Sequence, residues 1–267
     1  MTADRAAVAD FASELREAER NGTPTQLASE RFDDLDWGHA RRIALARDEL
    51  RVADGDELIG YKLGWTSAAM REALGIDRPN WGTLWRSQRC DGVLDLTTLR
   101  HAKLEPELVY VAARPLSGTD VTADDVARRA RGWAVGIEVV HPRWPTFDFT
   151  WLDNTADNSS AHAVAVGSAH PFHGDPAALT VHFGHSGGDG ADVERDGSGS
   201  AAMGSPAEAV AWLVRSLASE GRSLDAGQII FTGGLTAPFD AVAGTRYHAR
   251  CDRLGAVELL ATRPEGS

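Results

Sequence analysis

The sequence predicts a mixed α+β fold in which β-strands predominate. Helical patterns fill the first 52 residues, and most later segments read as short strands around one clearly marked helix. This order lacks the regular strand–helix alternation of a doubly wound sheet, so a fold with separate helical and sheet parts fits better. With 267 residues, 43% of them hydrophobic, the chain can bury a sizeable core. We therefore expect an N-terminal helical region at residues 1–57 and a β-rich domain at residues 58–267.

Two helices are expected in the N-terminal region. Val8, Phe11 and Leu15 recur at helical spacing, and Gly22 follows this run as a stop signal. A second helix is expected after Asp36, because an aspartate side chain can accept hydrogen bonds from the free N–H groups of a first helical turn.

Beyond residue 57, apolar runs bounded by turn residues predict eight strands. They cover residues 58–63, 108–112, 133–140, 161–166, 179–183, 229–232, 247–251 and 257–260. Residues 185–200 are rich in glycine, serine and aspartate, which predicts a hairpin or a mobile loop.

Two helices are expected among these strands. The first is capped by Thr66 or Ser67 and stopped by Gly75. The second begins with a capping box formed by Ser205 and Glu208, with a proline at its first position, and runs to about residue 220.

Charge and cysteine content exclude several classes of partner. A net charge of −12 argues against nucleic acid and anionic membrane surfaces. Two cysteines, Cys90 and Cys251, are too few for a disulfide framework, so we expect a reducing, cytoplasmic setting. The N-terminus lacks the layout of a signal peptide, and no apolar run is long enough to span a bilayer.

The pair Glu105 and Glu107 is the most informative feature for function. Side chains two residues apart on a strand point to the same face, and two carboxylates that close repel each other unless a cation lies between them. Hard divalent ions such as Mg²⁺ or Mn²⁺ prefer such oxygen ligands. An exposed strand with two hydrated glutamates is the alternative, and surface carboxylates are common.

Two further charged residues occur in apolar strands. Glu138 lies in an apolar run, where a carboxylate must be paired or bound to a metal unless it points to water. Lys62 lies in an apolar strand between two glycines. It is either a surface lysine or a buried group that binds a carboxylate or supplies a proton.

Two polar segments are candidates for substrate binding. Residues 154–160 combine asparagine, aspartate and serine, which suit an ordinary turn or a set of donors for a bound carboxylate. Residues 231–237 contain consecutive glycines and two threonines. They form either a tight loop or a segment whose backbone N–H groups bind an anion.

Together these segments resemble the hydratase/decarboxylase branch of the fumarylacetoacetate hydrolase superfamily. The family pattern runs through G-x-K-x-G-x-T-S, E-x-E, an E-V-hydrophobic strand, A-D-N-x-S and a G-x-T loop. All five motifs occur here in that order between about residues 58 and 260. This branch includes 2-keto-4-pentenoate hydratases and 4-oxalocrotonate decarboxylases.

The resemblance implies a fold, a metal and a site. We expect the fumarylacetoacetate hydrolase-like mixed β-sandwich roll, with the β-rich domain as the catalytic part, and a homo-oligomer. Carried over, Glu105, Glu107 and Glu138 would bind Mg²⁺ or Mn²⁺, which chelates a 2-oxo acid substrate. Lys62 and Asn80 would be the catalytic positions. The substrate-binding set would be Lys62, Ser67, Asp157, Ser160, Gly234 and Thr236.

The resemblance favours a decarboxylating lyase acting on a 2-oxohex-3-enedioate-like substrate through a metal-stabilised dienolate. Hydratases of the family carry an aspartate where this chain has Asn80, and an amide cannot act as a carboxylate base. Residues 144–149 and 232–237 also resemble decarboxylase segments. The chain departs from both groups at Trp65, His141 and Ala161, which suggests an altered substrate.

Three alternatives remain open. The first is a 2-hydroxypenta-2,4-dienoate (2-keto-4-pentenoate) hydratase. The second is an acylpyruvate-type C–C hydrolase, for which only His141 and His162 are candidate water-activating histidines. The third is an inactive oligomeric partner, although such a protein would have no reason to retain three glutamates.

Overall fold

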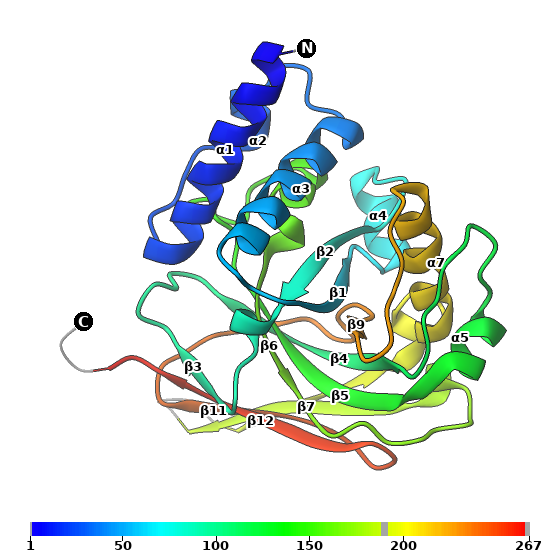
Figure 1. Cartoon of the computed structure of the whole chain (residues 1–267). Helices are drawn as coiled ribbons and strands as arrows, with labels where there is room; N and C mark the ends of the chain where they lie inside the picture. Colours follow the sequence, from blue (N-terminus) through cyan, green and yellow to red (C-terminus); the bar gives the residue numbers. More distant parts are fainter. Residues whose placement is uncertain (1, 188–191, 265–267) are drawn as a thin grey trace.

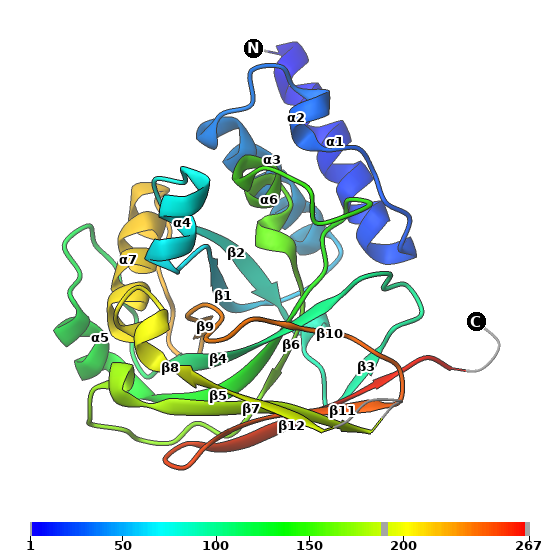
Figure 2. The same cartoon turned by 180° about the vertical axis from the view of Figure 1, so that it is seen from behind.

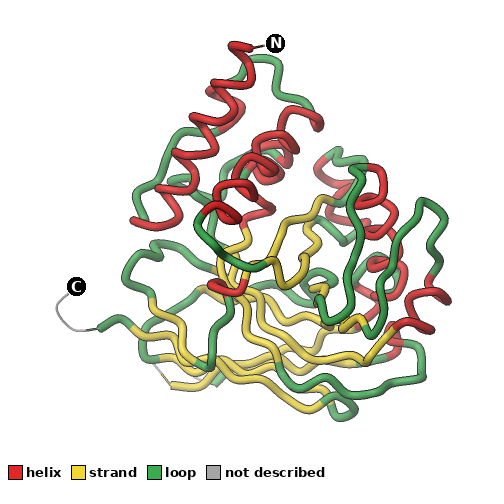
Figure 3. Tube along the Cα trace, viewed as in Figure 1, coloured by secondary structure: helices red, strands yellow, loops and turns green. Residues whose placement is uncertain are grey.

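Helices and sheets occupy separate parts of the molecule, which the computed structural model describes for residues 2–187 and 192–264 (Figure 1). Three N-terminal helices lie together on one side, and two β-sheets form the body of the protein (Figure 3). The predicted α+β class is therefore confirmed. The boundary expected between residues 57 and 58 falls in the connection between the third helix and the first strand.

The N-terminal helices are α1 (Thr2–Asn21), α2 (Ala28–Arg31) and α3 (Trp37–Ala53). Asp36 caps α3 as predicted, since its side chain accepts a hydrogen bond from the His39 backbone N–H at 2.7 Å. Phe11 on α1 stacks on Trp144, which belongs to the sheet-bearing part of the chain. A further helix that the sequence analysis missed, α6 (Trp151–Ala156), packs against α3 and α2 (Figure 2).

The first sheet has seven strands in the order β2-β1-β9-β4-β5-β6, with β10 paired to β4. All of its neighbouring pairs are antiparallel except β1 and β9. The strands are β1 (Leu58–Gly64), β2 (Asn80–Trp85), β4 (Lys103–Ala112), β5 (Ala130–Val140), β6 (Ala161–Val166), β9 (Ile229–Phe231) and β10 (Phe239–Asp240).

The second sheet has five strands in the order β3-β12-β11-β7-β8. They are β3 (Val93–Asp95), β7 (Thr180–Gly187), β8 (Val193–Ser198), β11 (Thr245–Cys251) and β12 (Gly255–Thr262). The two sheets face each other through contacts of β5 with β11 and β12, and alternate apolar side chains of both fill one continuous core. Strands β7 and β8 confirm the predicted hairpin, but its tip at 188–191 lies outside the described residues.

The other helices are α4 (Ala68–Leu74), α5 (Ala123–Arg129) and α7 (Pro206–Ser219). Ser67 and Gly75 cap α4 as expected, and Gly75 adopts a left-handed conformation. Helix α7 begins at Pro206, but the Ser205 side chain makes no capping hydrogen bond, so the predicted capping box was wrong. Among the described residues, no helix is long and apolar enough to cross a membrane.

Candidate active site

Three glutamates meet on two interior strands of the first sheet. Glu105 on β4 lies directly across from Glu138 on β5, and Glu107 follows two residues later on β4, on the same face. One carboxylate oxygen from each lies within 4.8 Å of the others. Strand alternation and register therefore bring together the three residues that the sequence proposed as metal ligands.

The carboxylates of Glu107 and Glu138 are fully buried and incompletely paired. The backbone N–H of Gly233 donates to Glu107 Oε2 at 2.6 Å. Among the described residues, none donates a hydrogen bond to Glu107 Oε1 or to either oxygen of Glu138. Leaving buried acceptors unpaired is costly, so these three oxygens fit an additional cationic partner.

Burial and mutual repulsion also disfavour ionisation of these glutamates. Burial, reinforced by the negative charge of Glu138, raises the pKa of Glu105 to about 7. The same two causes raise the pKa of Glu107 well above its usual range. A divalent cation would favour the ionised forms, so the donor set and its electrostatics both fit a hard metal ion.

Lys62 on β1 lies beside this group and is only 3% exposed. Its Nζ lies 3.2 Å from Glu138 Oε1 and donates to the Ser159 backbone oxygen at 2.9 Å and to Ser159 Oγ at 3.0 Å. Its two hydrogen bonds therefore go to Ser159, and its contact with Glu138 is an ion pair. Lys62 is therefore a buried, fixed cation and not a surface lysine.

The loop that holds Lys62 has an unusual backbone. Asn158, Ser159 and Ser160 have φ values of 55°, 53° and 55°, a left-handed conformation that residues with a Cβ seldom adopt in succession. The Asn158 side chain secures the loop, since it accepts from the Thr83 N–H at 2.7 Å and donates to the Thr83 carbonyl at 2.9 Å. This strained backbone directs both oxygens of Ser159 at Lys62.

The glycine loop after β9 shapes the site from the other side. Gly233 has a φ of +111°, and a Cβ there would lie 2.1 Å from Thr66 Oγ1. A Cβ on Gly234 would lie 2.6 Å from Glu105 Oε2. The glycine pattern predicts that these backbone N–H groups bind an anionic substrate, but the N–H of Gly233 donates to Glu107.

A cavity of about 540 Å³ adjoins the carboxylates. Five of the residues proposed from the sequence line it: Lys62, Ser67, Glu105, Gly234 and Thr236. Its apolar wall includes Trp65, Met70, Phe147, Phe149 and Leu235. The cavity thus has a charged end beside the glutamates and a mainly apolar remainder.

Two proposed residues, Asn80 and Ser160, are buried in a polar network and do not line the cavity. Asn80 Nδ2 donates to Asn154 Oδ1 at 2.7 Å and to Thr155 Oγ1 at 3.0 Å. Asn80 Oδ1 accepts from Ser159 Oγ at 2.9 Å, which links Asn80 to Lys62 through one hydroxyl. Ser160 Oγ accepts from Asn154 Nδ2 at 2.8 Å.

Asp157 also lies away from the cavity, in a buried ion pair. Its Oδ1 accepts from Arg143 Nε at 2.5 Å and from Arg47 Nη1 at 3.3 Å. Although burial raises the pKa of Asp157, the two guanidinium groups oppose that shift. The geometry therefore gives Asp157 a role in fixing the loop, through its ion pair with Arg143.

Sequence reasoning did not select Trp65, Asn154 and Ser159 as site residues, although all three line the cavity. Trp65 has a φ of 57°, and its Nε1–H donates to Asn154 Oδ1 at 2.9 Å. In the sequence, Trp65 stands out only as a departure from the family pattern. Asn154 and Ser159 lay within the polar segment that had been identified, but nothing in the sequence ranked its members.

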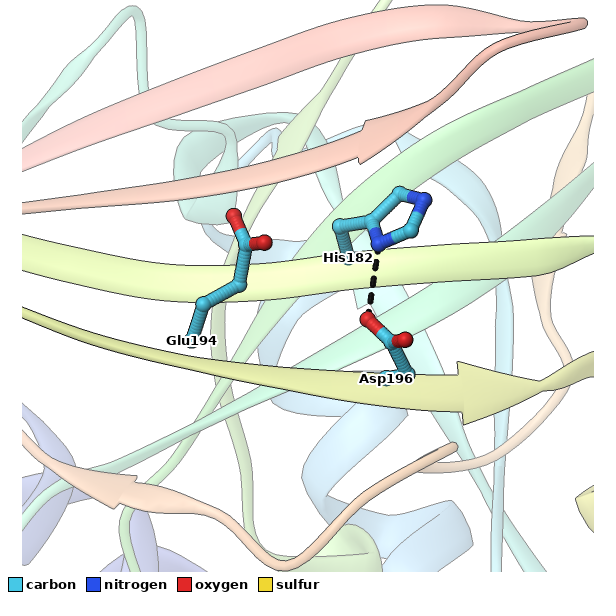
Figure 4. A group of neighbouring side chains, drawn as sticks. All are labelled: His182, Glu194 and Asp196. Atoms are coloured by element: carbon cyan, nitrogen blue, oxygen red, sulfur yellow. Dashed lines mark hydrogen bonds and ion pairs between the residues drawn. The ribbon is translucent and has the colours of Figure 1, made fainter.

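A second group of possible metal ligands lies on the second sheet. His182 on β7 and Asp196 on β8 are cross-strand partners whose Nδ1 and Oδ1 atoms lie 2.7 Å apart, with Glu194 nearby (Figure 4). Both carboxylates are exposed to solvent, and none of the three residues lines the cavity. The direct contact between His182 and Asp196 already accounts for this arrangement.

The fold and the buried three-carboxylate site together define a divalent-metal-dependent enzyme. Residues 46–259 match the model of the fumarylacetoacetate (FAA) hydrolase C-terminal family. This match covers more than half of the chain, so the protein belongs to the fumarylacetoacetate hydrolase family.

Relatives of known activity match over nearly the whole chain. The 2-keto-4-pentenoate hydratase of Burkholderia vietnamiensis is 31% identical, over 97% of this chain and 99% of its own length. The 2-hydroxyhexa-2,4-dienoate hydratase of Comamonas testosteroni is 30% identical, over 93% of this chain and 95% of its own length. The structure of 4-oxalocrotonate decarboxylase from Pseudomonas putida G7, complexed with magnesium and adipate, superposes with a TM-score of 0.89. Its identity is 29%, over 97% of this chain and 98% of that one.

Proposed function

We propose that this protein is a metal-dependent lyase that decarboxylates a 2-oxo acid of the 2-oxohex-3-enedioate type. The observation that carries the proposal is the group formed by half-buried Glu105 and the buried Glu107 and Glu138, with unpaired oxygens next to Lys62 at one end of the cavity. A 2-oxo acid presents its two chelating oxygens at one end and its carbon chain beyond them, in keeping with this cavity.

The three glutamates would hold Mg²⁺ or Mn²⁺, ions that prefer carboxylate oxygens. The bound metal supplies positive charge to the carboxylate and 2-oxo oxygens of the substrate, which favours negative charge at the C2 oxygen. The decarboxylase from Pseudomonas putida G7 was solved with magnesium, which supports the same kind of ion here.

Lys62 and the residues around it would orient the substrate. Ser159 and Glu138 fix the direction of the Lys62 ammonium, which adds a second positive charge at the chelating end. Ser67 and Thr236 bring hydroxyl groups to the cavity wall, and Phe147 and Phe149 keep water from its apolar part.

Decarboxylation is favoured because the rest of the cavity wall supplies no base. Of the described lining residues, Glu105 is the only carboxylate, and histidine and arginine are absent. Loss of CO₂ requires no activated water, since the C–C bond electrons flow through the alkene to the C2 oxygen. The distal carboxylate of the substrate would lie beside an apolar wall with no cation to stabilise its charge, and this favours its loss as neutral CO₂.

Hydration of a 2-hydroxypenta-2,4-dienoate is the second candidate, and the names of the two hydratase relatives favour it. It requires a group that moves protons at the distal carbons, and Asn80 is an amide that lies outside the cavity.

Two further alternatives have less support. A C–C hydrolase would need a histidine to activate water, but burial lowers the pKa of His141 to about 3 and that of His162 to about 4, and neither lines the cavity. An inactive partner would leave the unpaired carboxylate oxygens of Glu107 and Glu138 without a purpose.

The proposal extends to the setting of the enzyme. Cys90 and Cys251 are both free thiols, which supports a reducing, cytoplasmic environment. Association into a homo-oligomer is proposed from the family resemblance. The apolar side chains of Met70 and Leu74 on α4, more than half exposed, offer a surface for such contacts.

One experiment separates the candidate reactions. The purified protein is incubated with Mg²⁺ and, in turn, with 2-oxohex-3-enedioate, 2-hydroxypenta-2,4-dienoate and an acylpyruvate, with chelator-treated protein as the control. We expect metal-dependent CO₂ release from the diacid. Metal-dependent consumption of the dienoate without CO₂ would favour the hydratase, and no turnover of any substrate would refute a lyase.

A further inference from the structure

Trp65 occupies a backbone conformation that a bulky residue rarely adopts, with a φ of 57°. Two hydrogen bonds hold it there. Arg71 Nη1 donates to the Trp65 carbonyl at 2.6 Å, and Trp65 Nε1 donates to Asn154 Oδ1 at 2.9 Å. Such strain at a cavity wall points to a function for the side chain that it positions.

The indole of Trp65 determines the orientation of the Asn154 amide. An indole N–H can only donate, so the Asn154 atom that faces it must be the oxygen. The amide nitrogen of Asn154 then faces Ser160 Oγ, at 2.8 Å. The reverse orientation would place two donors against each other at Trp65.

The orientation of Asn154 in turn constrains position 80. Asn154 Oδ1 also faces the Asn80 amide nitrogen at 2.7 Å, so the residue at position 80 must donate a hydrogen bond there. An ionised carboxylate at this position would face another oxygen inside a fully buried network. Asn80 Oδ1 accepts from Ser159 Oγ, which accepts from Lys62, so position 80 lies one hydroxyl away from the ammonium.

We propose that Trp65 is a specificity-determining residue, which acts through Asn154 to require an amide at position 80. This inference rests on the proposed lyase function. By excluding a carboxylate at position 80, Trp65 removes a group that could exchange a proton with Lys62, which lines the cavity, through the Ser159 hydroxyl. Trp65 thus directs the enzyme towards a reaction that needs no such group.

Replacing Trp65 would release this constraint. In Trp65→Phe the indole donor is lost, so the Asn154 amide can turn and offer its nitrogen to position 80. The Asn154 oxygen would then accept from the Ser160 hydroxyl, whose hydrogen is free to rotate. A carboxylate at position 80 would then have a donor where it now meets an acceptor.

A double-mutant cycle tests the coupling through stability, independently of catalysis. Thermal unfolding is measured at pH 7 for the wild type, Trp65→Phe, Asn80→Asp and the double variant. We expect Asn80→Asp alone to lower the Tm by about 5 °C or more, and the same change to cost at most half as much when Trp65→Phe is also present. Effects on the Tm that simply add would overturn the coupling.

A matched control uses another buried indole. Trp85 Nε1 donates to Thr83 Oγ1 at 2.9 Å and makes no hydrogen bond to Asn154. Trp85→Phe also removes a buried indole donor, and its effect should add to that of Asn80→Asp. Equal rescue by Trp85→Phe would show that Trp65 has no special role.

The second readout is the reaction itself. We expect the ratio of water addition to CO₂ release to rise at least tenfold in the double variant relative to Asn80→Asp alone. An unchanged ratio, in proteins that still turn over substrate, would overturn the specificity role. If the wild type turns over no 2-oxo acid, the proposed function fails, whereas the stability cycle still decides whether Trp65 controls position 80.

Discussion

At the scale of single residues, the site depends on carboxylates whose burial costs free energy unless a cation is bound to them. Glu107 and Glu138 are buried with unpaired oxygens, and burial raises the pKa of both Glu105 and Glu107. Among the described residues, Lys62 is the cation that contacts this group, and of the three glutamates it contacts Glu138, at 3.2 Å. One ammonium cannot compensate three neighbouring carboxylates, which supports the proposal that a bound metal stabilises this arrangement.

The first prediction concerns Glu107. Glu107→Gln should lower divalent-metal affinity at least 100-fold and abolish turnover with it, because an amide loses the charge while keeping the size of the side chain. Isothermal titration with Mn²⁺ measures the affinity. Glu194→Gln is the matched control, since Glu194 is an exposed glutamate in the group with His182 and Asp196 on the second sheet. Metal-dependent turnover retained in Glu107→Gln would refute the ligand assignment.

The second prediction concerns pH. The folded pKa of Glu105, about 7, and the raised pKa of Glu107 both exceed their unfolded values, so the metal-free protein holds these protons more tightly when folded. The contribution of these two groups to the stability of the metal-free protein should be greatest below about pH 4.5, and it should fall as the pH rises towards 7. Added Mg²⁺ should therefore raise the Tm more at pH 7.5 than at pH 5.5, as thermal scans can measure. An equal rise at both pH values would contradict the prediction.

At the scale of elements, the site is made by strand alternation and by close backbone approach. Strands β4 and β5 supply all three glutamates, and their register places Glu105 opposite Glu138. The loop after β9 approaches so closely that only glycine fits at Gly234 without displacing Glu105. Carboxylate geometry is therefore set by two strands and one loop.

The third prediction tests that close approach. Gly234→Ala should displace the Glu105 carboxylate, because the added Cβ would lie 2.6 Å from Oε2, and should weaken metal binding about tenfold. Gly38→Ala is the control, since its Cβ would meet nothing nearer than 3.4 Å. Metal titration of both variants measures the effect. Wild-type affinity in Gly234→Ala would show that Glu105 does not depend on the loop.

The elements that sequence reasoning found are those with strong local signals. Alternation and apolar runs located the eight predicted strands, and Asp36, Ser67 and Gly75 marked helix ends correctly. Strands β2, β3 and β10 and helices α5 and α6 were missed. Helix α6 lies in a segment that reads as a turn and is stabilised by packing against α3. The residues of α6 and of the loop after it looked alike in sequence, and only their tertiary contacts distinguish them.

At the scale of the whole molecule, the N-terminal helices are tied to the site by buried charges. Glu19 on α1 lies between Arg47 and Arg51 of α3, and Arg47 reaches Asp157 at the start of the strained loop. Burial alone would raise the pKa of Glu19, but the two arginines hold it below its usual range. The helical region therefore supports the loop that orients Lys62, although none of its described residues lines the cavity.

The fourth prediction belongs to this network. Glu19→Gln should destabilise the protein by about 3 kcal/mol, because it leaves two buried guanidinium groups without their shared carboxylate. Glu14→Gln on the same helix should change stability little, since the Glu14 side chain is 43% exposed and its carboxylate lies 3.9 Å from Arg31. Urea unfolding of both variants measures the difference. Equal stability of the two would show that the network is not a main support of the fold.

The charges around Lys62 have a consequence for the order in which ligands enter. Three ionised glutamates and one ammonium sum to two negative charges, which a divalent ion cancels and a monovalent ion does not. At a pH high enough to ionise all three glutamates, the metal-free site would repel an incoming carboxylate, and a bound divalent ion would remove that repulsion. At such a pH we therefore expect the ion to bind before the acid. Substrate affinity would then depend on the cation more strongly as the pH rises.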